Sequence, residues 1–174
     1  PRLRPGGSDV RWLRDTREPI DYVIIAYDDF AEEAEILAAW RRANLYEITD
    51  TREARVRVVR VNDIMDEFTY GMWDPIALRH FLEYAYRYYG ACGSDDRLSY
   101  CLFFGDHTYD FRDNEQSGIL DFVPSWEDNR ASIFEISYGN VQYVTDDPLA
   151  RFHGPSDFFT DIYLGRITVT NRQE

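Results

Sequence analysis

The sequence predicts an α/β fold, a mostly parallel sheet with flanking helices that forms a three-layer sandwich. Two apolar runs, at residues 22–27 and 98–104, are typical of strands that are buried on both faces. Between these two runs, residues 55–61 alternate arginine with valine and predict the second of three strands in chain order. Helical patterns separate these strands, and a βαβαβ order of this kind gives parallel neighbours through right-handed crossovers.

Capping residues indicate where the intervening helices should begin. Apolar side chains recur at helical spacing over residues 30–38, after Asp28 and Asp29, either of which can cap a helix. Asn62 is expected to cap a short second helix. Asp74, with proline next in the chain, is a typical start for the third helix.

The remaining chain is loop-rich. Residues 105–158 contain two short strand candidates, at 119–123 and 141–144, and residues 162–170 predict one more strand. Residues 1–20 are polar, contain turn-forming residues and are expected to be a linker or lead-in. The predicted domain therefore starts at the first apolar run.

Composition excludes several classes of partner. The 174 residues carry a net charge of -13, and all of the 19 basic residues are arginine. A surface of this charge repels nucleic acid phosphates and anionic lipids, so neither is expected as a partner. An aromatic content of 16% indicates a folded chain. No stretch approaches the roughly 18 apolar residues that a membrane span needs.

The two cysteines, Cys92 and Cys101, do not predict a catalytic or metal site. Cys101 lies within an apolar run and is expected to be a buried thiol. Cys92 lies in a turn, and a disulfide between the two is left open. No close cysteine or histidine spacing fits zinc.

Polar residues follow the strands at the edge where ligands bind in open α/β sheets. Asp28 and Asp29 come after the first strand, and the turn Gly105-Asp106-His107 comes after the third. A carboxylate-based metal site for phosphoryl transfer or hydrolysis is one interpretation of this edge. A response-regulator receiver is excluded, since it needs a lysine.

The sequence around the three histidines gives only weak support for a catalytic role. His107 could act as a general base, but a nucleophile and a base must lie within reach of each other. Cys101 lies mid-strand and is a poor partner for it. His80 is expected on a helix surface, and His153 in a loop. The residues alone therefore define no cysteine–histidine dyad.

An ordered series of segments resembles the gingipain-like cysteine peptidase family. The series covers roughly residues 20–172, and its order is more specific than any single motif. The segments that carry it are Asp21–Ile25 with Asp29–Phe30, Val58–Val59 leading into Asp63–Gly71, Asp74–Leu82, Tyr100–His107, Val123–Trp126, Thr145–Asp147 and Asp161–Ile167.

The resemblance implies a caspase-like fold of two subdomains, with residues 21–174 as the first. It implies a secreted or surface cysteine endopeptidase of the bacterial outer envelope, exported by the type IX system or related to the sortase of that system. The partners would be a peptide or protein substrate and the second subdomain. The alternative is a gingipain-like binding or secretion module without catalytic residues.

The resemblance also assigns roles to residues. Family members carry the catalytic histidine and cysteine after the Gly-Arg strand, hence after Arg166, so this segment alone is expected to be inactive. In arginine-specific members an aspartate of the Ser-Asp element binds the substrate guanidinium. Asp146 is the nearest match and Asp147 the next. No cofactor is required, and a structural calcium ion in the acidic loops is compatible with the family.

Overall fold

The computed structural model describes residues 13–14, 18–45, 53–90, 97–108, 110, 114–116, 118–128, 143–154 and 156–172. Its centre is a four-stranded parallel sheet in the order β2-β1-β3-β6. The strands are β1 (Tyr22–Ala26), β2 (Val56–Arg60), β3 (Tyr100–Phe104) and β6 (Tyr163–Ile167). All three pairings are parallel, which confirms the predicted sheet.

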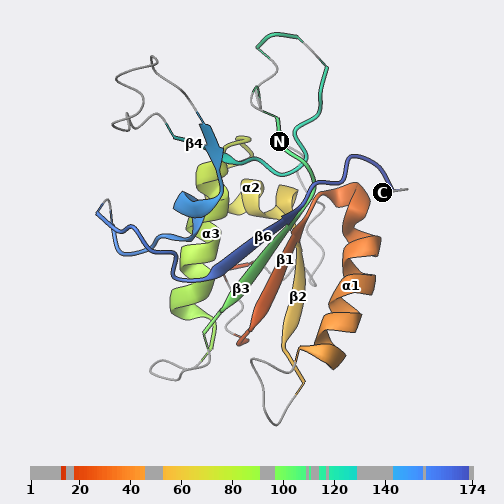
Figure 1. Cartoon of the computed structure of the whole chain (residues 1–174), viewed down its shortest axis with the longest axis vertical. Helices are drawn as coiled ribbons and strands as arrows, with labels where there is room; N and C mark the ends of the chain where they lie inside the picture. Colours follow the sequence, from red (N-terminus) through yellow and green to blue (C-terminus); the bar gives the residue numbers. More distant parts are fainter. Residues whose placement is uncertain are drawn as a thin grey trace.

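Helices cover the two faces of the sheet, as Figure 1 shows. The 3₁₀ turn η1 (Asp28–Phe30) leads into α1 (Ala31–Asn44), which packs against β1 and β2 on one face. On the other face, α2 (Val61–Thr69) and α3 (Pro75–Tyr88) enclose the larger core. The predicted three-layer α/β sandwich is therefore confirmed.

The alternation of side chains in the strands explains the two cores. Val23 and Ile25 of β1 face α2 and α3, whereas Ile24 faces α1, and all three are fully buried. A strand that is buried on both faces must be apolar along its whole length. The continuous apolar run at residues 22–27 is therefore explained by the position of β1 inside the sheet.

The helix starts agree with the sequence only in part. Asp74 accepts a hydrogen bond from the backbone N–H of Ile76 at 2.9 Å, so the predicted cap of α3 is confirmed. Neither Asp28 nor Asp29 caps a helix, because both lie within η1. Asn62 is not a cap either, since the chain turns directly from β2 into α2 with extended Arg60 at the N-cap.

A small antiparallel pair and a 3₁₀ turn lie beside the main sheet. Strand β4 (Trp126–Asp128) pairs with β5 (Tyr143–Thr145), and η2 (Asp147–Ala150) follows. The candidate strand at 119–123 is wrong, because the backbone N–H groups of Phe122 and Val123 both bond to the Asp106 carbonyl and close a turn. Residues 141–142 of the other candidate lie outside the described residues, and its remainder falls in β5.

Part of the expected lead-in packs against the domain. Leu13 is buried, and its carbonyl accepts a hydrogen bond of 2.6 Å from the Tyr89 hydroxyl. None of the helices among the described residues combines the length and apolar character needed to cross a bilayer.

Candidate functional site

The turn after β3 is fixed by the backbone of its neighbours. The N–H groups of Gly105 and Asp106 donate to the carbonyls of Ile167 and Val169, each at 3.0 Å. Gly105 has φ +150°, and a Cβ atom there would lie 3.0 Å from side-chain carbons of both Phe122 and Val123. Glycine is therefore required at this position, because any side chain would displace the loop that packs on it.

Arg166 of β6 organises the carboxyl end of the sheet. Its guanidinium forms a two-point ion pair with Asp146, at 2.9 and 2.8 Å. The same group donates to the carbonyls of Gly105 at 3.0 Å and Val123 at 2.7 Å. It also lies over the Phe103 ring, with 4.8 Å between the guanidinium carbon and the ring centroid. One side chain thus joins β6 to the end of β3, the loop that follows β3 and the end of β5.

Asp146 has both carboxylate oxygens engaged. Besides the bonds from Arg166, its Oδ1 accepts a hydrogen bond of 2.6 Å from the Ser125 hydroxyl. The Asp146 side chain is 21% exposed and that of Arg166 only 8%. Asp146 therefore binds a guanidinium of its own chain, whereas the resemblance implies that it binds the guanidinium of a substrate. A role in substrate binding stays a prediction, and it requires this ion pair to open.

Asp147 has a different environment from its neighbour. Its side chain is 61% exposed and makes a 3.5 Å ion pair with Arg151, four residues along the chain. An exposed pair of this kind contributes little to stability and exchanges readily with other charged groups. Asp147 is thus the accessible carboxylate of the two at this end of η2.

Asp106 and His107 lie at the same edge, as predicted, but they form no catalytic pair. The Nδ1 atom of His107 is 3.8 Å from the Asp106 carboxylate, and it is shielded from solvent without a hydrogen bond to a described residue. Behind them, Asp121 accepts hydrogen bonds from the Trp73 indole at 2.6 Å and from the Thr108 N–H at 3.0 Å. Burial raises the pKa of Asp121, while the Trp73 hydrogen bond opposes that shift.

Sequence analysis does not identify Asp121 as a site residue, because it lies in the segment assigned to a strand. The only available signal was a carboxylate among the apolar residues of that segment. Its two hydrogen bonds connect the residues after β3 to Trp73, which precedes α3. Asp121 therefore holds the edge turn against the helix layer.

Cys101 is a core thiol. It is free, fully enclosed between the layers, and burial raises the pKa of its thiol well above the ordinary value. The charged groups that act on that pKa are Asp146, which raises it further, and Arg166, which lowers it. The thiolate is the reactive form of cysteine, so Cys101 is unsuited to act as a nucleophile. Cys92 lies outside the described residues.

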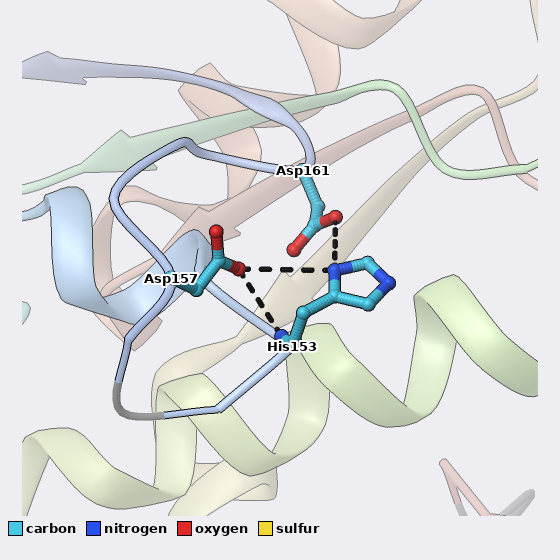
Figure 2. Close-up of side chains that lie close together, drawn as sticks. All are labelled: His153, Asp157 and Asp161. Atoms are coloured by element: carbon cyan, nitrogen blue, oxygen red, sulfur yellow. Dashed lines mark hydrogen bonds and ion pairs between the residues drawn. The ribbon is translucent and has the colours of Figure 1, made fainter.

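His80 and His153 lie on a helix surface and in a loop, as expected, and His153 also has two aspartates beside it. His80 is exposed on α3. His153 is exposed in the loop before β6, where Asp157 and Asp161 point toward it (Figure 2). These three residues form a cluster with the ligand types of a metal site. Closely spaced cysteines and histidines are the usual sequence pattern of a zinc site. A histidine followed by aspartates at i+4 and i+8 does not match that pattern, so the sequence did not predict this cluster.

We expect Cys101 to resist alkylation in the folded protein. In a Cys92→Ser background, iodoacetamide at neutral pH should leave Cys101 unmodified in the native state and modify it rapidly in denaturant, because only unfolding removes the burial that keeps the thiol protonated. Mass spectrometry measures the modified fraction. Rapid alkylation of the native protein would contradict this assignment.

The Arg166–Asp146 ion pair should dominate local stability. Asp146→Asn removes the negative charge but leaves the Arg166 guanidinium buried, which should cost about 3 kcal/mol of unfolding free energy. Asp147→Asn is the matched control, and it should change stability by less than about 0.5 kcal/mol because that carboxylate is exposed. Urea unfolding measures both values. Equal losses of unfolding free energy in the two variants would show that the Arg166–Asp146 pair contributes no more to stability than the exposed pair.

Comparison with known proteins identifies the family. The family model described as peptidase family C25 matches residues 15–174. A crystal structure of dimeric latent PorU from Porphyromonas gingivalis has a similar fold, with a TM-score of 0.66 and 22% identity. The match covers 90% of this chain and 14% of that one. No curated protein matches the sequence. The resemblance to gingipain-like peptidases is confirmed, and the chain belongs to peptidase family C25.

Proposed function

We propose that this chain is the first subdomain of a cysteine endopeptidase, and that it supplies scaffold and substrate-contacting loops to an active site completed by a second subdomain. The family match over residues 15–174 supports a cysteine peptidase as the parent protein. A secreted or surface location in the bacterial outer envelope, with type IX export, is part of the same proposal. Peptides or proteins would be the substrates.

An exposed apolar half-face of the sheet is the observation that best supports this proposal. On the α1 side, Tyr22, Tyr100 and Tyr163 stack across three strands, with ring centroids 5.9 and 5.2 Å apart. Helix α1 covers the β1 end of this row, whereas Tyr163 at the other end is 70% exposed. Ile167, next along the same face of β6, is also exposed. Exposed apolar surface at a sheet edge is typical of an interface.

A groove continues this surface toward α1. It is lined by apolar side chains of η1, α1, the ends of β3 and β6 and the segment after β6, together with three polar or charged ones. The apolar residues are Phe30, Ile36, Leu37, Trp40, Phe104, Ile167 and Val169, and the others are Glu33, Asn171 and Arg172. β6 has a partner strand on one side only among the described strands. A second subdomain that extends the sheet beyond β6 would cover both the free edge and the groove.

The catalytic histidine and cysteine would belong to that second subdomain. The buried thiol of Cys101 is unsuited to nucleophilic attack, as argued above. The charged groups that act on its pKa are Asp146 and Arg166, and neither is a histidine. The chain alone is therefore proposed to be inactive.

Substrate contact is proposed at the carboxyl edge of the sheet. Asp147 offers an exposed carboxylate there, and Asp146 would contribute only if Arg166 released it. The turn Gly105-Asp106-His107 borders the same edge, so His107 would line the approach and not act as the base. A non-catalytic binding or secretion module is the alternative function, since the scaffold described so far would serve it equally well.

Activity-based labelling separates the two functions. We expect an acyloxymethyl-ketone probe to label the full-length parent protein on a cysteine beyond residue 174, and to leave this chain unlabelled as the control. A probe with arginine at the reactive position, compared with a generic one, reports on the specificity role of Asp146 and Asp147. A folded, fully processed parent that reacts with neither probe would favour the non-catalytic module.

The apolar half-face should make the isolated chain self-associate. Sedimentation velocity should show a mass that rises with concentration, and Tyr163→Glu combined with Ile167→Glu should restore the monomer by placing charges on the exposed face. Met72→Glu is the control, because Met72 is also apolar and exposed but lies between α2 and α3, the helices of the opposite face of the sheet. A monomer at all concentrations, or the same response in the control, would argue against an interface on β6.

A further inference from the structure

The loop between η2 and β6 brings three metal-ligating side chains together. The Nδ1 atom of His153 lies 2.8 Å from Asp161 Oδ1 and 3.7 Å from Asp157 Oδ2. One ligand atom from each residue lies within 4.8 Å of the other two. Figure 2 shows both carboxylates turned toward the same ring nitrogen. The three residues follow one another at intervals of four, within a single loop.

Backbone hydrogen bonds hold the carboxylates in place. Asp161 Oδ2 accepts from the Phe152 N–H at 2.7 Å, which leaves Oδ1 facing His153. Asp157 accepts from the N–H groups of His153 at 3.1 Å and Phe159 at 3.3 Å. The Asp161 N–H in turn donates to the Ala150 carbonyl at 2.8 Å, which anchors this end of the loop to η2. The aspartate ligands are therefore oriented before any ion binds.

Charge balance at the cluster calls for a cation. The side chains of Asp157 and Asp161 are only 14% and 12% exposed, and within the described part of the chain their sole ion-pair partner is His153. The neighbouring Arg151 pairs with Asp147 instead. Two shielded carboxylates that face one imidazole form an acidic site that attracts a cation. The net charge of -13 adds to this need.

We propose that His153, Asp157 and Asp161 bind a zinc ion. Zinc takes one imidazole nitrogen and carboxylate oxygens in a tetrahedral arrangement, and at ligand distances near 2.1 Å neighbouring ligand atoms lie about 3.4 Å apart. The distance from His153 Nδ1 to Asp161 Oδ1, 2.8 Å, is shorter than that value, and the distance to Asp157 Oδ2, 3.7 Å, is longer. A water molecule would complete the four ligands. Calcium fits less well, because it needs six to eight oxygen ligands and does not favour imidazole nitrogen.

The position of the site indicates a structural role. Asp161 lies just before the first residue of β6, whereas Arg166 lies near the other end of that strand. The ion would therefore fasten the loop to the amino end of β6, away from the proposed substrate edge. The same loop presents Phe158 and Phe159, which are 73% and 84% exposed. This inference does not depend on the proposed peptidase function.

The test uses the chain after treatment with a chelator. Isothermal titration should show one zinc ion bound per chain, and calcium should not compete for it. Free zinc at about 100 times its Kd should raise Tm by roughly 5–10 °C. His153→Ala and Asp161→Asn should each weaken zinc affinity by more than about 10-fold. His80→Ala, which removes an exposed histidine on α3, should bind zinc as the unaltered chain does.

X-ray absorption at the zinc edge provides a measurement that does not depend on any variant folding. The unaltered, zinc-loaded chain should show one imidazole nitrogen and oxygen ligands without sulfur. Any of three results would overturn the proposal: no saturable zinc binding, a sulfur ligand, or unchanged affinity in folded His153→Ala and Asp161→Asn. Calcium binding in place of zinc would overturn it as well.

Discussion

The buried guanidinium of Arg166 constrains the whole carboxyl end of the sheet. A charge with 8% of its side chain exposed must be neutralised and hydrogen-bonded, and Arg166 takes its partners from Asp146, Gly105 and Val123. Gly105 and Val123 lie at opposite ends of the connection between β3 and β4, and Asp146 directly follows β5, so both segments have to reach one point above Phe103. The carboxyl end of the sheet is thus built around an internal ion pair.

Unequal coverage of the two faces connects the fold to the proposed function. Helices α2 and α3 cover one face of the sheet, whereas on the other face α1 packs over β1 and β2 and leaves Tyr163 and Ile167 of β6 exposed. Figure 1 shows β6 at the side of the sheet remote from β2 and α1. A neighbouring subdomain would stabilise this edge strand, because it would pair the free backbone groups and remove the apolar side chains from water.

Several acidic side chains in the described part of the chain accept hydrogen bonds from uncharged donors. Asp74 caps α3, Asp121 holds the edge turn, and Asp161 orders its own loop through backbone N–H groups. Such bonds are strong because the acceptor is charged, and they use no basic side chain. Backbone N–H groups therefore stabilise some of the carboxylates that have no arginine partner. In the His153 cluster, two shielded carboxylates lie beside a histidine and form no ion pair with an arginine among the described residues.

The sequence by itself determined the class of fold, the parallel sheet and the start of α3 at Asp74, because apolar periodicity and local capping are short-range properties. The gingipain-like family came from the resemblance of an ordered series of segments. It also placed Asp28, Asp29, Gly105, Asp106 and His107 at one edge, since parallel strands end on the same side. Only the tertiary structure decided that Asp146 is held by Arg166, that Asp121 bonds Trp73, and that His153 meets two aspartates. Those contacts depend on how distant loops close over the sheet, and no local pattern encodes that.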